Sequence, residues 1–218
     1  PKVRRTDAHD KRYEAVRPNH LWHADFVHRF INKRRIDVLL FIDDFSRFIT
    51  GWAIWDGERV GAVMETFEAA VSRHGRPEMM MSDGGSAFWA WRGVSRFTRL
   101  LEELGVDQLV AKNPQSNGKL EALNANIQKE LFDPERFFDL GETQRRLATW
   151  VSFYNLRRTN QGLGGLLVPG DRYFGRADEV MACIEAGGVP DGIGEPAPAG
   201  QRMLDLFRVT ARAGKVEV

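Results

Sequence analysis

Cysteine is almost absent from this chain, and no stretch of it is long and apolar. Cys183 is the only cysteine among 218 residues, which excludes an internal disulfide and a zinc site built from several cysteines. The longest run of purely aliphatic and aromatic residues is 38–42, which is too short to span a bilayer. No segment resembles a signal peptide, and no internal repeat is visible. We therefore expect a cytoplasmic protein with no membrane partner.

The residues that are present are typical of a folded domain with one basic end. Hydrophobic residues make up 43% and charged residues 28% of the chain. Residues 1–36 hold ten Lys and Arg against four acids, a net charge of +6, so the other 182 residues carry about −5. A basic arm favours a polyanion as partner, although a solvated tail that keeps the protein soluble is the alternative. Because the chain begins with Pro1 rather than Met, we expect a fragment or a processed protein.

Hydrophobic periodicity predicts an α/β arrangement. Alternating or continuous apolar patterns predict five strands, at 21–30, 38–42, 47–55, 78–81 and 106–110. Apolar residues at helical spacing predict four helices, at 59–74, 94–104, 120–131 and 143–154. Short turns between the first three strands favour an antiparallel meander, and the whole order favours a mixed five-stranded sheet flanked by helices.

The remaining segments predict how the chain is divided. Residues 155–176 look extended and rich in turns, and 187–200 have the Gly and Pro content of a linker. Strand-like patterns near the C-terminus indicate either a small β unit or a tail. The predicted parts are a basic leader (1–17), a catalytic core (18–135), a helical extension of the core (136–186), a linker (187–203) and a possible small β domain or tail (204–218).

Three acidic residues occupy positions from which the predicted elements bring them together. Asp25 lies inside the first strand, Asp83 follows the fourth, and Glu121 lies in the first turn of a later helix. Each alone has a structural explanation, as a turn residue or a partner of the helix dipole. If the first and fourth strands are neighbours, however, the three carboxylates converge and repel one another unless a cation neutralises them. We therefore predict a site for Mg²⁺ or Mn²⁺, with two ions, of the kind that catalyses phosphoryl transfer.

Four short motifs follow one another along the chain. They are Leu-Trp-His-Ala-Asp-Phe at 21–26, Ile-Asp-Asp-Phe-Ser-Arg at 42–47, Ser-Asp-Gly-Gly-Ser-Ala-Phe at 82–88 and Pro-Gln-Ser-Asn-Gly-Lys-Leu-Glu at 114–121. A fifth segment begins with Tyr154-Asn155 and ends at Tyr173. Together these motifs resemble the catalytic core of DDE transposases and retroviral-type integrases, above all bacterial insertion-sequence transposases, over about residues 17–176.

The resemblance implies a fold, a site and an activity. The fold is ribonuclease H-like, and the catalytic and metal-binding triad is Asp25, Asp83 and Glu121. The activity is metal-dependent polynucleotidyl transfer, in which DNA is cut and the released 3′-OH attacks target DNA without a covalent protein–DNA intermediate. The implied partners are element-end and target DNA and further copies of the chain. The implied location is the bacterial cytoplasm, on the nucleoid when the enzyme is active.

Two other functions stay open, one because another enzyme can share the fold and one because the sequence departs from the family pattern. Gly84 follows the second acid where the family usually has Asn, and Ala122 follows the third where it often has Arg. A ribonuclease H-type nuclease would hydrolyse nucleic acid without joining strands. A catalytically inactive, DNA-binding remnant of a transposon would bind DNA tightly without metal and would not cut it.

Two further sets of residues are weaker candidates. Asp43 is the nearest competitor for a catalytic place, whereas Asp44 is expected to hold the turn at Ser46 and Arg47 through side-chain-to-backbone bonds. Five polar side chains are predicted DNA contacts, the first three because helical spacing puts them on the side of Glu121: Lys119, Asn124, Gln128, Arg145 and Arg146.

Overall fold

The structure is a computed structural model, and the chain divides into two compact units, residues 1–147 and 148–218. The boundary falls within helix α4 (Leu140–Leu156). The described residues are 15–56, 60–83, 85, 88, 93–110, 118–134, 136–193, 210–212 and 215–217. The predicted leader therefore lies outside the described residues up to position 14, and the predicted linker does so from position 194.

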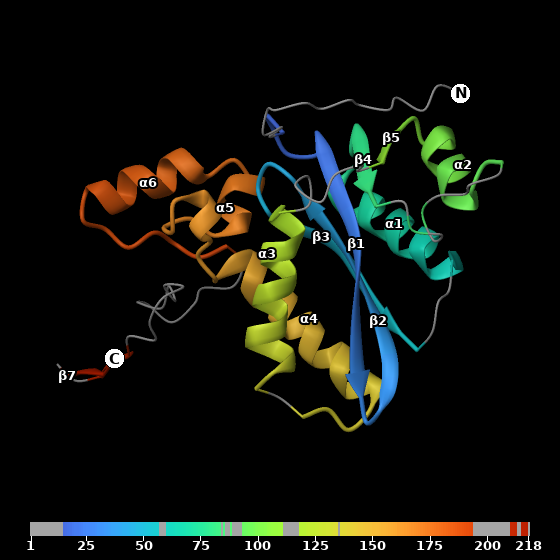
Figure 1. Ribbon diagram of the computed structural model, residues 1–218. Helices are drawn as coiled ribbons and strands as arrows, with labels where there is room; N and C mark the ends of the chain where they lie inside the picture. The colour runs from blue at the N-terminus through green and yellow to red at the C-terminus, as the bar shows by residue number, and fades with distance from the viewer. Residues whose placement is uncertain are drawn as a thin grey trace. The chain divides into compact units, whose positions relative to one another are not determined.

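The first unit is built on a mixed five-stranded sheet with the order β3-β2-β1-β4-β5 (Figure 1). The strands are β1 (Leu21–Ile31), β2 (Arg34–Asp43), β3 (Ile49–Trp55), β4 (Met79–Ser82) and β5 (Asp107–Val110). The first three form an antiparallel meander, while β4 runs parallel to β1 and β5 parallel to β4. The predicted meander is confirmed, and the pairing of β1 with β4 meets the condition under which Asp25 and Asp83 can converge. Asn32 and Lys33 join β1 to β2 with positive φ angles of 49° and 67°, as a tight hairpin of right-handed twist requires.

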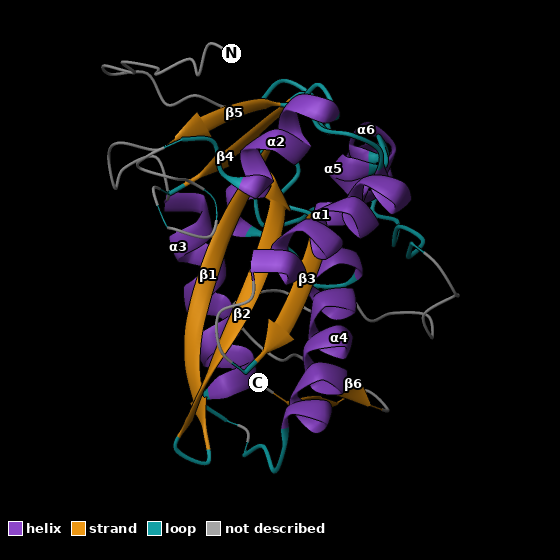
Figure 2. Ribbon diagram, turned by 90° about the vertical axis from the view of Figure 1, so that its right-hand side faces the viewer, coloured by secondary structure: helices purple, strands orange, loops and turns teal. Residues whose placement is uncertain are grey.

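One face of this sheet carries the main hydrophobic core. Helices α1 (Val60–His74) and α2 (Arg96–Glu103) lie in front of the sheet in Figure 2, and α3 (Gly118–Ile127) lies behind it. Trp22 of β1, Phe41 of β2, Phe67 of α1 and Phe97 of α2 belong to one buried cluster. At Gly51 of β3 an added Cβ would lie 2.9 Å from the Ala70 side chain of α1, so the close approach of helix and sheet requires glycine there.

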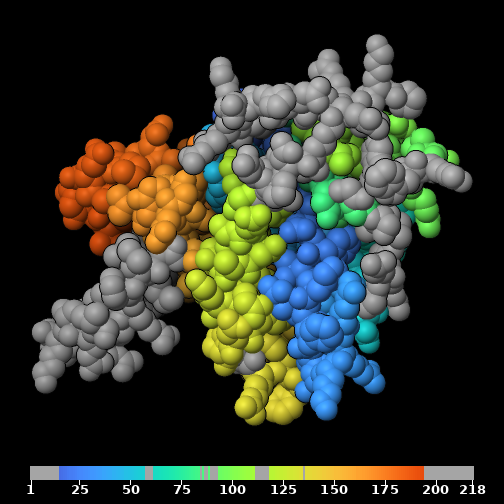
Figure 3. All heavy atoms as spheres, in the orientation of Figure 1, coloured from blue at the N-terminus to red at the C-terminus, as the bar shows by residue number. Residues whose placement is uncertain are grey.

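The opposite face of β1 meets α3. Because side chains alternate along a strand, His23 and Asp25 lie on the face opposite to Trp22. The Nδ2 of Asn124 in α3 donates to the Oδ2 of Asp25 at 2.9 Å. Figure 3 shows the atoms of α3, coloured yellow-green, alongside the blue atoms of the β1–β2 hairpin. The helix continues as a π-helical turn, η2 (Gln128–Phe132), where the sequence predicted uninterrupted α-helix.

The second unit differs from the extended segment that was predicted for residues 155–176. It contains a short 3₁₀ helix, η3 (Gln161–Leu163), and a short helix, α5 (Pro169–Tyr173). The side chain of Asn160 accepts from the N–H of Gly162, and Pro169 opens α5 in a conformation that suits its fixed φ. Helices of three to five residues produce no apolar periodicity, so caps of this kind are their only signal in the sequence.

The second unit also contains elements that follow α5. Helix α6 (Ala177–Glu185) contributes Val180 to a small buried cluster with Leu163 and Leu167. Strands β6 (Thr210–Arg212) and β7 (Lys215–Glu217) pair antiparallel, in the region where the sequence indicated strands. Among the helices in the described ranges, none is long and apolar enough to cross a membrane.

Candidate active site

Asp25 and Asp83 lie side by side at the edge that forms where β4 ends against the middle of β1. The parallel register of β1 and β4 runs from Leu21 opposite Met79 to Ala24 opposite Ser82. The residue that follows each of the last two is an aspartate, Asp25 or Asp83. Asp25 is half-buried and Asp83 is exposed. Burial raises the pKa of Asp25, and the negative charge of Asp83 raises it further, while hydrogen bonds from Asn124 and from the N–H of Phe26 oppose the rise. The two carboxylates are therefore close enough to repel each other.

The backbone of Gly85 contacts Asp83. The Oδ1 of Asp83 accepts a hydrogen bond from the N–H of Gly85 at 3.0 Å. An added Cβ at Gly85 would lie 2.9 Å from that same oxygen. Glycine at this position therefore lets the backbone approach the carboxylate and orient it at the end of β4.

Helix α3 brings Asn124 onto Asp25 and carries Glu121 in its first turn. The two residues are three positions apart, so they share one side of the helix. Asn124 binds Asp25, and its own Oδ1 is buried with no hydrogen-bond partner among the described residues. Glu121 is exposed. Within the described ranges no three His, Cys, Asp or Glu side chains form a group that could hold a metal ion, so the structure brings together Asp25 and Asp83 but does not close Glu121 onto them.

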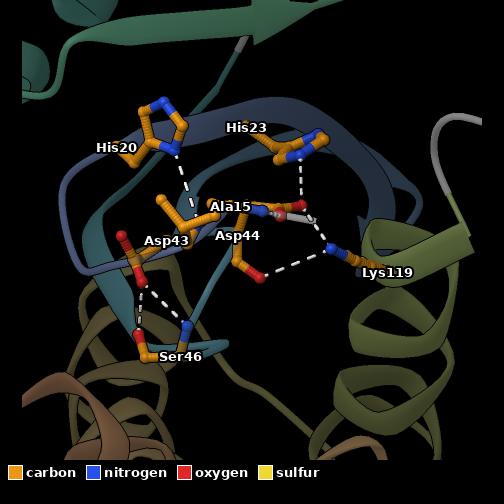
Figure 4. Close-up of polar contacts among 8 residues, drawn as sticks. Ala15, His20, His23, Asp43, Asp44, Ser46 and Lys119 are labelled. Carbon is orange, nitrogen blue, oxygen red and sulfur yellow. Dashed lines mark hydrogen bonds and ion pairs between the residues drawn. The ribbon is translucent and has the colours of Figure 1, made fainter. Parts of the chain in front are cut away.

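A buried cluster around Asp44 includes His23 of β1 and Lys119 of α3 (Figure 4). The Asp44 side chain is 1% exposed, and its Oδ1 accepts from the Nε2 of His23 at 2.8 Å and from the Nζ of Lys119 at 2.6 Å. Its Oδ2 accepts from the N–H of Ala15 at 2.7 Å. Burial alone would raise the pKa of Asp44, but the hydrogen bonds from His23, Ala15 and Lys119 outweigh it and hold the pKa well below its usual range. Asp44 is therefore an ionised carboxylate bound to three separate segments.

The turn after β2 is held by Asp43 rather than by Asp44, which corrects the assignment made from the sequence. The Oδ1 of Asp43 accepts from the N–H of Ser46 at 2.8 Å and from its Oγ at 2.5 Å. Its Oδ2 accepts from the N–H of Asn19 at 2.8 Å. Sequence alone does not distinguish two adjacent aspartates, because their backbone directions at the strand end decide which one faces the turn. The Asp43 carboxylate is committed to this turn and not to the edge that holds Asp25.

The five predicted DNA contacts already have partners or lie on the surface. Lys119 binds Asp44, and Asn124 binds Asp25. Gln128 donates to an aspartate at the end of the π-helical turn. Arg146 forms an ion pair of 2.9 Å with a glutamate one turn earlier in α4, and Arg145 is exposed beside it. Their contact with DNA stays a prediction.

The cluster of His23, Asp44 and Lys119 was not found from the sequence. Its members come from three distant segments and share no local pattern. A weak signal exists, because His23 and Lys119 each stand two residues before an acid of the predicted triad.

Known proteins are similar to this chain over the region that contains Asp25, Asp83 and Glu121. Two family models, each described as an integrase core domain, match residues 15–114 and 110–167. The transposase for insertion sequence element IS904 of Lactococcus lactis is 24% identical over 156 residues, which are 69% of this chain and 60% of that protein. The transposase for IS629 of Shigella sonnei is 26% identical over 161 residues, or 72% of this chain and 53% of that protein. The chain thus spans about half the length of the transposases it matches.

Solved structures share the fold. The catalytic core domain of HTLV-2 integrase, solved in complex with magnesium, matches with a TM-score of 0.58 at 18% identity, over 73% of this chain and 99% of that one. The catalytic core domain of BIV integrase matches with a TM-score of 0.55 at 22% identity, over 75% and 99% of the two chains. The predicted ribonuclease H-like fold is therefore confirmed.

Proposed function

Because the chain belongs to the integrase core family of DDE transposases and integrases, we propose that it is the catalytic part of a DNA transposase. The proposed reaction cuts the DNA at an element end and joins the resulting 3′-OH to target DNA. The observation that carries the proposal is the pair of Asp25 and Asp83 at one sheet edge, beside the helix that bears Glu121.

The Asp25–Asp83 pair fits a divalent cation. Asp25 is half-buried against a second carboxylate, and that repulsion contributes to its raised pKa. On α3 the ammonium of Lys119 binds Asp44 rather than this pair. Carboxylate oxygens are the ligands that Mg²⁺ and Mn²⁺ prefer, and the HTLV-2 integrase core is described as a magnesium complex. We propose that Asp25 and Asp83 hold the metal, with Glu121 as a further ligand and two ions per site.

The proposed roles follow from how each side chain is held. Bound divalent ions would activate the attacking oxygen and stabilise the leaving oxygen of the phosphodiester. Asn124 fixes one oxygen of Asp25, and the N–H of Phe26 donates to the other at 2.9 Å, so the carboxylate has one orientation. Asp83 and Glu121 are both exposed, which leaves them accessible to a DNA phosphate.

The proposed partners are element-end DNA, target DNA and further copies of the chain. Solved HTLV-2 integrase cores described as dimeric and trimeric forms support self-association. The basic residues of 1–36 supply charge for phosphate contacts. Since bacterial DNA lies in the cytoplasm, the proposed enzyme acts there, on the nucleoid.

The test removes each proposed ligand without changing its size. Asp25→Asn, Asp83→Asn and Glu121→Gln are incubated with labelled element-end DNA and Mn²⁺, and both cut and joined products are scored. Each variant should lose both activities by at least about 100-fold, because a misplaced cation no longer stabilises the reacting oxygens. Asp107→Asn changes an exposed aspartate on the neighbouring strand β5 and should keep the parent rate.

A thermal measurement separates metal binding from chemistry. Metal that binds only the folded state adds about 2.7 kcal/mol at 100 times its dissociation constant. Mn²⁺ should therefore raise the melting temperature of the parent but not of a variant carrying both Asp25→Asn and Asp83→Asn. Equal shifts in the two proteins would place the metal elsewhere. In the cutting assay, a Glu121→Gln variant that cuts at the parent rate would show that Glu121 is not a metal ligand.

The same assay distinguishes the two alternative functions. Cutting without joining would identify a ribonuclease H-type nuclease. Tight DNA binding without metal and without cutting would identify an inactive remnant of a transposon.

A further inference from the structure

Asp44 connects two segments that carry proposed metal ligands. Its Oδ1 binds His23, which stands two residues before Asp25 on the same face of β1. The same oxygen binds Lys119, which stands two residues before Glu121 in the first turn of α3. Figure 4 shows His23 and Lys119 reaching Asp44 from the strand and from the helix. One buried carboxylate therefore fixes the distance between the two backbones next to the site.

The hydrophobic contacts of α3 do not by themselves fix the direction in which its first turn points. Leu120, Leu123 and Ile127 bury one stripe of the helix, which holds its long axis in place. Apolar contacts are not directional, so they permit small rotations and shifts that change where Glu121 points. A 2.6 Å ion pair from Lys119 to a carboxylate with 1% exposure is directional and little screened by salt.

The charge of Lys119 is balanced inside the protein. Asp44 is ionised over the working pH range because its pKa is held below the usual range, so the ammonium faces a full negative charge. The Lys119 side chain is 24% exposed, with its Nζ on Asp44 rather than extended into solvent. These contacts favour a role in holding α3 over a role in binding DNA phosphate.

We propose that Asp44 and Lys119 are positioning residues that hold the first turn of α3 so that Glu121 meets the cation held by Asp25 and Asp83. The proposal rests on the proposed function for its metal site. It assigns Lys119 a different task from the DNA contact predicted from the sequence.

The test compares Lys119→Met, which removes the charge at similar length, with Lys119→Arg, which keeps it. Lys129→Met in η2 removes the charge of an exposed lysine and serves as the matched control. Mn²⁺ affinity is measured by calorimetry without DNA, and hydrogen exchange follows the amides of residues 122–125, whose acceptors are the carbonyls of the first turn of α3. Lys119→Met should weaken Mn²⁺ binding about 10-fold to 100-fold, the usual effect of losing a group that orients a metal ligand. Lys119→Arg and Lys129→Met should stay close to the parent.

A second measurement separates positioning from DNA contact. Without metal, Lys119→Met should leave the slope of log DNA affinity against log salt unchanged, whereas a lost phosphate contact lowers it by about 1. A reduced slope with parental Mn²⁺ affinity would overturn the proposal. Asp44→Asn should weaken Mn²⁺ binding at least as much as Lys119→Met does, and adding Lys119→Met to it should change little, because the ion pair with Lys119 is already lost.

The outcomes for the two proposals are distinguishable. A parent protein that binds Mn²⁺ but does not cut DNA would refute the proposed function and leave the positioning role standing. If the parent binds no Mn²⁺, hydrogen exchange decides: faster exchange of the amides of residues 122–125 in Lys119→Met supports the positioning role, and unchanged exchange refutes it.

Discussion

Replacing Asp43 with Asn tests whether this acid is structural, as the bonds in the turn indicate. The side chain is 0% exposed and accepts three hydrogen bonds. One oxygen takes both bonds from Ser46 and the other takes the bond from Asn19. Asparagine has the same shape but a single acceptor oxygen, so it keeps the partners of only one side.

The expected cost follows from the bond that is lost. If the amide oxygen stays on Ser46, the amide NH₂ faces the N–H of Asn19, and a buried donor without a partner costs about 1–3 kcal/mol. Burial, and to a smaller extent the charge of Asp44, raises the pKa of Asp43, so removing its charge recovers part of that cost. We expect a net loss of about 1–2 kcal/mol in the free energy of unfolding. For a chain of this size the melting temperature should fall by about 2–8 °C.

Thermal unfolding without metal measures the loss, and DNA cutting is assayed well below both melting temperatures. The variant should melt earlier than the parent and should still cut. In contrast, Asp25→Asn should melt at or above the parent temperature, because removing a charge that burial and Asp83 disfavour outweighs the bond lost from Asn124 or Phe26. An unchanged melting temperature would show that these bonds do not hold the turn. A folded Asp43→Asn protein that cuts nothing, beside an active Asp25→Asn protein, would move the catalytic role to Asp43.

Two further predictions concern charge. Deleting residues 1–12 should reduce the slope of log DNA affinity against log salt, while keeping the buried Ala15 and the ion pair of Arg17 with Glu78. An unchanged slope would mean that residues 1–12 do not contact phosphate. The deleted cations are Lys2, Arg4, Arg5, Lys11 and Arg12. Asp44 has a lower pKa folded than unfolded, so its contribution to stability is complete above about pH 5 and is lost as the pH falls. Asp44→Asn should accordingly flatten the acid side of the stability curve measured by urea unfolding, and an equally steep curve would contradict the pairing.

The fold of the first unit could be read from the sequence because its elements are long and their patterns clear. The alternation in β1 and the helical spacing in α1 each mark one face, and the continuous apolar run in β2 matches a strand that is buried on both faces. The order of elements did not decide whether β1 and β4 are neighbours, so the meeting of Asp25 with Asp83 stayed conditional until the pairing was seen.

The parts that were missed depend on contacts between distant residues or on very short elements. The choice between Asp43 and Asp44 as the turn residue depends on which side chain faces Ser46, and this is decided by the local backbone. The binding of Lys119 to Asp44 joins residues 75 positions apart, which no local pattern records. The short helix α5 depends on its Pro169 start and on a cap by Asp171, rather than on periodicity.

The parallel pairing of β1 with β4 also determines when the aspartates meet during folding. The pairing joins residues 21–24 to 79–82, and the chain between them forms β2, β3 and α1. The meander of β1, β2 and β3 needs only local hairpins, which form quickly. The pairing of β1 with β4 must close a long loop, and the loss of chain entropy comes before the new contacts form. We therefore expect Asp25 to be placed in the meander before β4 brings Asp83 beside it. The edge assigned to the cation exists only after β4 has docked, so competence to bind the ion arises late in folding.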